Sequence, residues 1–278
     1  MRAYRSMFAA TLAVASLGSA LLPSRLAAEA PRLDATLVAL GADGTLLRFR
    51  ASAPAAAERV RPTPAGIVPI GIDVRPKNGK LYGLTAASDV YEIDPSVGAT
   101  TFVATLTIPF DAGEASAFDF NPQSDRLRLI GRNGQNLRVH PELGAAANDA
   151  APAYARSDTH GGARPVITGA AYTNAVADTP TTKLFDIDTA LDVLVLQEPP
   201  NDGILTTIGD LGVDFDAESG FDILTVDGVD HAFAASRATL YAVDLATGRA
   251  TALGTIGDGS VRVTGLAALP PSRGDESH

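Results

Sequence analysis

The chain has 278 residues, no cysteine and no tryptophan, and its 32 acidic residues outnumber its 22 basic residues, for a formal net charge of −10. The missing cysteines exclude disulfides, thiolate zinc sites, iron–sulfur clusters and thiol nucleophiles. The acidic balance disfavours binding to nucleic acid or to an anionic membrane surface, because both recruit lysine and arginine.

The N-terminal residues are predicted to be an export signal. Arg2 and Arg5 precede an apolar run from Met7 to Leu22, and small residues follow as far as Ala28. This order is typical of a signal peptide covering residues 1–28, and an uncleaved N-terminal anchor is the alternative. We therefore expect a periplasmic or extracellular protein that has no contact with the membrane after cleavage.

Two short elements recur along the rest of the chain, where apolar and β-branched runs alternate with turn residues and predict many short strands. The first element is a small residue, an apolar residue and a polar or small residue. Its copies, which are 46, 52, 51 and 45 residues apart, are Gly71–Asp73, Ala117–Asp119, Gly169–Ala171, Gly220–Asp222 and Gly265–Ala267. The second element is an apolar run that usually ends in aspartate. Its copies are centred on Leu47, Tyr91, Leu137, Phe185 and Tyr241.

The ends of this repeat are complementary. The copy at Leu47 has no first element before it, and the copy at Gly265 has no second element after it. Four complete four-stranded units and one composite unit predict a five-bladed β-propeller over residues 35–270, closed by the N- and C-terminal strands. A sixth blade within residues 145–165 is the alternative, and a β-sandwich or solenoid is the rival architecture. Residues 271–278 are predicted to be a disordered tail.

Five longer segments of the chain have a distinctive sequence. They are Gly71–Leu84, Phe118–Gly144, Val166–Asn174, Thr181–Ile223 and Leu240–Gly257. Together they resemble a family of bacterial secreted proteins known as domain of unknown function 4394 (DUF4394), over most of residues 35–270. The resemblance implies a secreted, β-propeller-like protein and brings with it no established activity, cofactor or catalytic residue.

Three aspartates occupy the third position of the first element. If this element is the innermost strand of each blade, Asp73, Asp119 and Asp222 lie at one level around a central channel. Their repulsion would be relieved by a divalent cation such as calcium, or by Arg75 two residues along; hydrogen bonds from neighbouring backbone amides are the alternative. Asp73, Asp119, Asp222 and Arg75 are the candidate ligand-binding residues. No other cofactor and no metal-ligand set is predicted.

Two further clusters of charged residues have weaker patterns. The acidic run Asp214–Asp222 lacks the glycine and the closing glutamate of a calcium loop at the required positions, so a solvated loop is favoured. Arg126, Arg128 and Arg138 flank an Asn-Gly hairpin turn and alternate with apolar residues. They would bind an anionic ligand or pair with the surplus carboxylates, and the second interpretation is favoured.

No catalytic signature is present. The sequence contains no Gly-x-Ser-x-Gly elbow, phosphate-binding loop or dinucleotide fingerprint. We therefore predict a non-catalytic propeller that binds an unknown small molecule or protein at its loop face or channel. A hydrolase or lyase that uses the channel carboxylates, with or without a cation, and a structural surface or matrix protein are the alternatives, so enzymatic activity stays an open question at this point.

Overall fold

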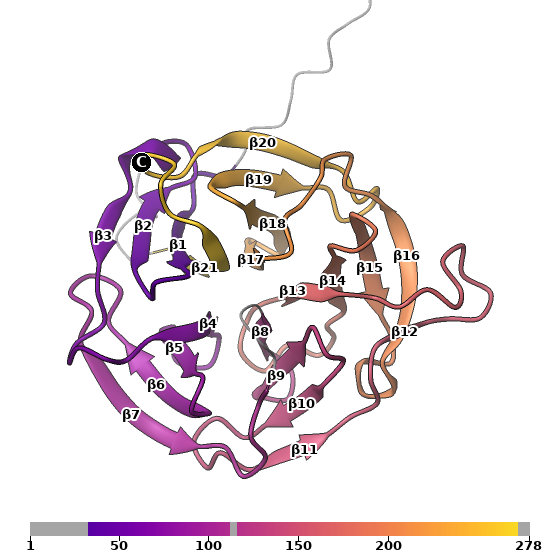
Figure 1. Ribbon diagram of the computed structural model, residues 1–278, viewed down its shortest axis with the longest axis horizontal. Coiled ribbons are helices and arrows are strands. Elements are labelled where there is room, and N and C mark those ends of the chain that lie inside the picture. Colours follow the sequence, from indigo (N-terminus) through magenta and orange to yellow (C-terminus); the bar gives the residue numbers. More distant parts are fainter. Residues whose placement is uncertain (1–32, 112–115, 272–278) are drawn as a thin grey trace, which may run out of the picture. The chain divides into compact units, whose positions relative to one another are not determined.

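The computed structural model describes residues 33–111 and 116–271, and these residues form five sheets arranged as blades around a central axis (Figure 1). The chain is a five-bladed β-propeller, as the repeat predicts. The six-bladed alternative is wrong, because residues 145–165 contribute outer strands to two of the five blades. The predicted signal peptide, residues 1–28, and nearly all of the predicted tail lie outside the described residues.

Blade 1 joins the two ends of the described chain. From the axis outward it contains β21 (Val263–Leu269), β1 (Thr36–Gly41), β2 (Leu46–Arg50) and β3 (Glu58–Val60), with η1 (Pro54–Ala56) between β2 and β3. The last strand pairs antiparallel with the first, so that Leu266 lies opposite Ala39. The predicted composite blade is therefore confirmed, and main-chain hydrogen bonds close the ring.

Blades 2, 3 and 5 each contain four antiparallel strands in chain order. Blade 2 consists of β4 (Pro69–Arg75), β5 (Lys80–Thr85), β6 (Asp89–Ile93) and β7 (Thr100–Thr105). Blade 3 consists of β8 (Ser116–Asn121), β9 (Arg126–Gly131), β10 (Asn136–Val139) and β11 (Ala146–Asn148). Blade 5 consists of β17 (Ser219–Val226), β18 (Val229–Ser236), β19 (Thr239–Val243) and β20 (Ala250–Thr255).

Blade 4 departs from this plan. From the axis outward it contains β13 (Ile167–Tyr172), β14 (Leu184–Asp188), β15 (Val193–Gln197), β16 (Ile204–Asp210) and a fifth strand, β12 (Ala153–Tyr154), which pairs parallel with β16; η2 (Pro200–Asp202) connects β15 to β16. The second sequence element, at Phe185, lies in the second strand here and in the third strand of the other blades. A polar loop, residues 173–183, replaces the intervening strand.

The apolar core is divided among the junctions between blades. Within the described residues, each of five clusters of buried side chains lies between two neighbouring blades. Glycines let the innermost strands approach closely: a Cβ atom on Gly169 of β13 would lie 2.6 Å from Cβ of Phe221 in β17. No helix in the described part of the chain is long and apolar enough to cross a membrane.

Candidate functional site

The three aspartates predicted at one level meet at the axis of the ring. Asp73 lies in β4, Asp119 in β8 and Asp222 in β17, the innermost strands of blades 2, 3 and 5. All three side chains are buried, and one carboxylate oxygen of each lies within 4.8 Å of the other two. Among the described residues, this is the one group of acidic or histidine side chains close enough together to hold a metal ion.

These carboxylates accept hydrogen bonds from all five innermost strands. In each strand the donor is the amide of the residue that follows the aspartate position. The donors are Val74, Phe120, Tyr172, Ile223 and Ala268. Asp73 accepts from Val74 of its own strand at 2.6 Å and from Phe120 of the next blade at 2.8 Å. Asp222 repeats this arrangement with Ile223 and blade 1, and Asp119 accepts from Tyr172 of blade 4 at 3.1 Å.

Burial raises the pKa of all three carboxyl groups. The charge of Asp222 raises the pKa of Asp73 further, and the charges of Asp73 and Asp222 raise that of Asp119. The pKa of Asp222 is raised to about 6, against the opposing effect of its two amide hydrogen bonds. All three carboxyl groups therefore keep their protons to a higher pH than an exposed aspartate does.

Most of the carboxylate oxygens at the axis already accept a hydrogen bond from the main chain. Five of the six carboxylate oxygens accept a backbone N–H bond. Each of these bonds stabilises the charged carboxylate and occupies one of the two lone pairs of its oxygen, so the main chain itself offsets part of the repulsion among the three aspartates. The hydrogen bonds from neighbouring backbone amides, expected as the alternative to a cation, are therefore present.

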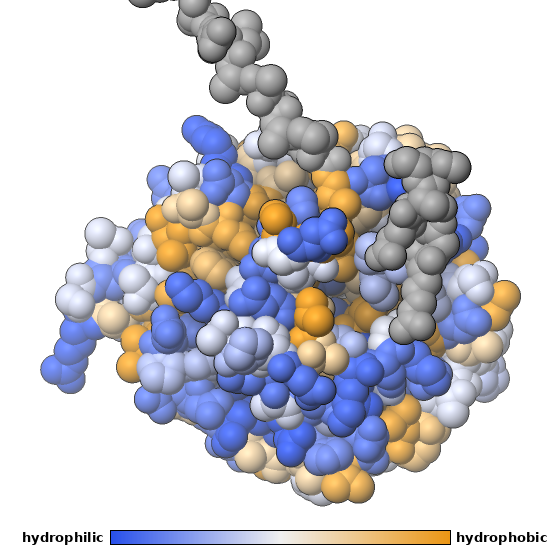
Figure 2. All heavy atoms as spheres, turned by 180° about the vertical axis from the view of Figure 1, so that it is seen from behind, coloured by the Kyte–Doolittle hydropathy of each residue, from blue (hydrophilic) through white to orange (hydrophobic). Residues whose placement is uncertain are grey.

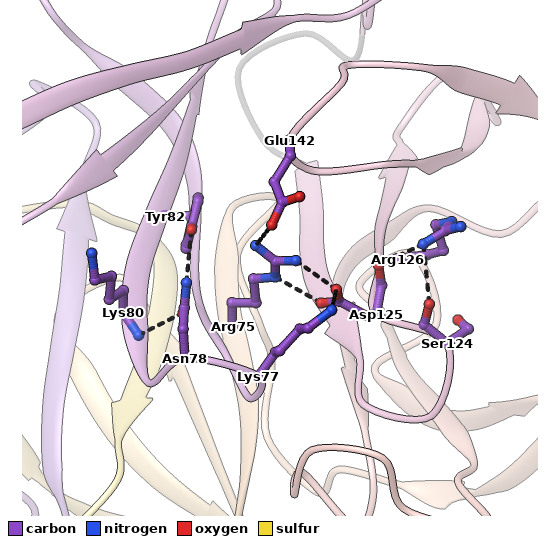
Figure 3. Close-up of polar contacts among 9 residues, drawn as sticks. All are labelled: Arg75, Lys77, Asn78, Lys80, Tyr82, Ser124, Asp125, Arg126 and Glu142. Atoms are coloured by element: carbon purple, nitrogen blue, oxygen red, sulfur yellow. Dashed lines mark hydrogen bonds and ion pairs between the residues drawn. The ribbon is translucent and has the colours of Figure 1, made fainter.

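Arg75 does not contact the three aspartates, in contrast to the expectation from its sequence position. Its Nε and Nη2 atoms donate to the two carboxylate oxygens of Asp125 at 2.7 and 2.5 Å, and Nη1 donates to Glu142 at 2.9 Å (Figure 3). Both acceptors belong to turns of blade 3, so the arginine clamps blade 2 to blade 3. Arg75 also lowers the pKa of Asp125, because a bidentate guanidinium favours the charged carboxylate.

The channel is wider on one side of the aspartate level than on the other. On the side where the innermost strands begin, the glycines at their centres let them pack until a cavity of about 10 Å³ is left. On the other side, a cavity of about 120 Å³ is lined by the three aspartates together with Pro76 and Pro270. We call this side, where the innermost strands end, the C-terminal face.

Two larger cavities lie on the C-terminal face. The first, about 660 Å³, lies between blades 5 and 1; its walls include Ala35, Leu224 and Leu269, and an ion pair of 3.0 Å joins Arg50 to Asp34 at its edge. The second, about 480 Å³, lies between blades 3 and 4, and we call it the 3–4 groove. Its walls are Asn121, Gln123, Ser124, Arg126, Leu127, Arg128, Arg138, Tyr172, Thr182, Pro200 and Asn201.

The arginines of the 3–4 groove have different partners. Arg128 and Arg138 both bind Asp149, at 2.5 and 2.9 Å, which agrees with the favoured interpretation that they pair with carboxylates. Arg126 instead donates to the backbone carbonyl oxygens of Ser124 and of its neighbour Asp125, at 3.2 and 3.0 Å. The groove therefore keeps more positive charge than its own carboxylate neutralises.

The acidic run Asp214–Asp222 does not form a metal-binding loop. Asp214 pairs with Arg237 at 3.2 Å, and Glu218 pairs with Arg262 at 2.8 Å. Asp222 points to the channel instead. The run is thus divided among separate contacts, and the expected solvated loop holds only for its first part, because Glu218 is buried and Asp222 lies in the buried strand β17.

Sequence reasoning missed the residues that position Arg128. Asn136, Asp149 and Asn201 converge on it from β10, from the segment after β11 and from η2. No motif connects them, since Asn201 is 73 residues away from the arginine. The side of the molecule seen from behind the view of Figure 1 is largely hydrophilic, with separate hydrophobic patches (Figure 2).

The chain matches one family by sequence and is similar to several solved structures. The sequence model of the family described as Domain of unknown function (DUF4394) matches residues 45–267, and no curated protein matches the sequence. A protein of unknown function from Bacteroides thetaiotaomicron VPI-5482 is similar with a TM-score of 0.48 and 15% identity, over 85% of this chain and 62% of that one.

Two auxiliary nutrient binding proteins are also similar in fold. The one from Bacteroides thetaiotaomicron VPI-5482 has a TM-score of 0.43 and 15% identity, over 72% of this chain and 56% of its own. The one from Bacteroides ovatus ATCC 8483 has the same score and identity, over 77% and 57%. The chain thus spans about three-fifths of the length of these structures.

Proposed function

The chain belongs to the family described as domain of unknown function DUF4394, and we propose that it is an exported, non-catalytic β-propeller that binds a small molecule or a protein through its C-terminal face. One observation supports this function above the others. The cavities of about 660, 480 and 120 Å³ are all lined by residues at the ends of innermost strands and by the loops that follow them.

The two larger of these cavities have the volume typical of ligand sites, which enclose roughly 300–1,000 Å³ in most proteins. Loops held by a rigid scaffold commonly carry the binding residues. The aspartates at the axis support a binding role over a catalytic one, because they are buried and line only the smallest of the three cavities, of about 120 Å³. A general acid or base needs an oxygen within reach of a substrate.

Because the protein has no native cysteine, an introduced thiol can be labelled selectively to block one cavity. Ser124→Cys and Thr36→Cys each place a single thiol at one of the two larger cavities, and Ala87→Cys places one in an exposed turn on the opposite face. The mature protein, unlabelled or labelled with a bulky maleimide, is titrated by calorimetry with a panel of neutral sugars, acidic sugars, amino acids and short peptides.

We expect at least one compound to bind, and a label at Ser124→Cys or Thr36→Cys to abolish its binding while the label at Ala87→Cys does not. Binding that only the label on the opposite face abolishes would contradict the proposal. Export is tested separately: the N-terminal sequence of protein recovered from the periplasm or the medium should begin near residue 29.

The cation-dependent alternative has its own test. Calcium is removed with a chelator, and the bound metal and the midpoint of thermal unfolding are measured before and after. A bound ion together with a midpoint that falls on chelation would favour a cation among the three aspartates. We expect neither, because the amide dipoles already stabilise these carboxylates.

A further inference from the structure

One position breaks the packing rule of the ring. In every blade, the residue paired with the channel position from the second strand faces the next blade. These residues are Val38, Tyr82, Arg128, Phe185 and Phe233. Four of them are apolar or aromatic and belong to the buried cluster at their junction. Blade 3 has a buried arginine at this position.

The partner across the junction differs in the same way. At the junction of blades 2 and 3, the ring of Tyr82 packs edge-to-face on Phe120, with 5.4 Å between centroids. At the junction of blades 3 and 4, Arg128 Nε donates to the hydroxyl of Tyr172 at 3.3 Å. Phe120 and Tyr172 are equivalent, since each follows the channel position of its innermost strand. A cation and a hydroxyl thus replace an aromatic pair.

Arg128 is held in place from several directions. Nη1 donates to Asn136 at 2.7 Å and to Asp149 at 2.5 Å, and Nη2 donates to Asn201 at 2.7 Å. A buried guanidinium has a desolvation penalty that well-packed apolar side chains avoid, so stability alone does not favour an arginine here. Local departures from a packing rule are expected where a protein has a functional site.

The arginine lines a cavity whose walls are formed mostly by polar residues. The 3–4 groove has two apolar residues in its walls, Leu127 and Pro200; the others are arginines, one tyrosine, amides and hydroxyls. The nearby carboxylates are already paired, Asp149 with two arginines and Asp125 with Arg75 and Lys77. Arg126 makes no ion pair within the described residues, so its charge is available to a ligand.

We propose that the 3–4 groove binds a hydroxylated organic anion of monosaccharide size, which carries one carboxylate or phosphate group. This proposal rests on the proposed function and names its ligand class. Arg126 and Arg138 bind the anionic group, because a guanidinium fork matches the geometry of both oxyanions. The amides and hydroxyls of Asn121, Ser124 and Thr182 bind the ligand hydroxyls. Arg128 is a positioning residue that fixes Tyr172 and Asn201 in the wall.

The test uses the mature protein and four probes in calorimetric titrations at low salt: glucuronate, glucose 6-phosphate, glucose and inorganic sulfate. We expect glucuronate or glucose 6-phosphate to bind at least about tenfold more tightly than glucose and sulfate, since a charge-assisted hydrogen bond without a partner weakens binding by about this factor. Tighter binding of glucuronate would assign a carboxylate to the ligand, and tighter binding of glucose 6-phosphate would assign a phosphate.

Variants locate the site. Arg126→Gln and Arg138→Gln are each expected to weaken binding of the sugar anion at least about tenfold. Arg48→Gln, at the other large cavity of the same face, is the matched control and should change the affinity less than twofold. Arg128→Leu should weaken binding and alter the fluorescence or NMR signals of Tyr172, while thermal unfolding shows that the protein is still folded.

Several results would overturn the proposal. If glucose binds as tightly as the sugar anions, the ligand needs no anionic group. If sulfate binds as tightly, the ligand needs no hydroxyl groups. If Arg126→Gln and Arg138→Gln leave the affinity unchanged, the ligand does not bind in the 3–4 groove. Failure of both sugar anions to bind also overturns it. The proposed function then stands if another compound binds and is blocked by the label at Thr36→Cys, and falls if no compound of the panel binds at either cavity.

Discussion

Two neighbouring junctions of the ring, between blades 2 and 3 and between blades 3 and 4, have the same backbone plan and different contents. In the first, aromatic side chains fill the interior, and the buried Arg75 binds Asp125 and the exposed Glu142 at the edge of this packed cluster. In the second, the charged residue Arg128 lies inside, and a cavity of about 480 Å³ opens beside it. The repeat therefore determines how blades pack, and one exception to it coincides with a ligand-sized groove.

This difference also separates two uses of arginine. Arg75 and Arg128 are both almost fully buried, and both bind a carboxylate at 2.5 Å. Arg75 adds a clamp outside a junction that is already packed, whereas Arg128 takes the place of the packing itself. We expect the first junction to be more sensitive to loss of apolar volume, and the second to loss of charge pairing.

The largest effect is expected at the apolar junction. Phe120→Ala removes a buried ring that packs on Tyr82, and should lower the free energy of unfolding by about 3–5 kcal/mol. Urea unfolding followed by circular dichroism measures this change. Leu143→Ala, at a highly exposed position, is the control and should change it by less than about 0.5 kcal/mol. A loss below about 1 kcal/mol in Phe120→Ala would contradict the comparison.

At the polar junction, the effect should depend on pairing. Asp149→Ala leaves Arg128 buried without its carboxylate, and should lower the free energy of unfolding by about 3 kcal/mol. Adding Arg128→Leu to Asp149→Ala should restore most of that loss, because the unpaired charge is gone and an apolar side chain fills the junction. If the double variant is less stable than Asp149→Ala alone, the arginine contributes more than its ion pair.

The aspartates at the axis predict a smaller effect that depends on pH. A carboxyl group whose pKa is higher in the folded state contributes stability that is complete below the unfolded value and is lost as pH rises through the folded value. For Asp222 this window runs from 3.8 to about 6. Asp119 shares the trend, because burial and two neighbouring carboxylates raise its pKa.

Asp119→Asn tests this trend without breaking an amide contact, because Asp119 uses one oxygen for Tyr172 and the described residues donate no hydrogen bond to the other. The variant should exceed the wild type in stability at pH 8 by on the order of 1–3 kcal/mol, and by less at pH 4. Asp222→Asn should destabilise the protein, since its new NH₂ group faces the amide of Ile223 or Ala268. If the difference in the free energy of unfolding between Asp119→Asn and the wild type does not change with pH, this interpretation is wrong.

The smallest effect is expected at the rim of the first junction. Lys77 is exposed and binds Asp125 at 3.1 Å, where Arg75 already makes a bidentate contact. Lys77→Ala should change the free energy of unfolding by no more than about 0.5 kcal/mol, and still less at high salt. A loss above about 1 kcal/mol would show that the rim charges act as a network rather than as separate pairs.

The sequence predicts the ring well because the innermost strands repeat their residues. A small residue and an aspartate or alanine recur at fixed spacing, so the blade count, the closing strand and the level shared by Asp73, Asp119 and Asp222 follow from the repeat. Blade 4 is less predictable, since a polar loop replaces a strand and β12 comes from an irregular stretch.

Side-chain direction and distant contacts limit the prediction of the site. Arg75 lies two residues after Asp73, but its long side chain reaches the turns of blade 3 instead of the axis. The alternation around Arg126 and Arg128 does indicate a charged strand. It does not indicate that Asn136, Asp149 and Asn201 gather around Arg128, because those contacts depend on how two blades meet.

The closing strand has a consequence for the order of assembly. β21 is synthesised after all the other described strands, and its only hydrogen-bonded partner among them is β1, the first of them in the chain. Until it arrives, the edge of β1 is open to pairing with another chain, and Asp222 lacks the Ala268 amide. A chain that stops before Val263 therefore has an incomplete ring. The exposed edge of β1 makes such a chain prone to aggregation, however well the other blades are packed.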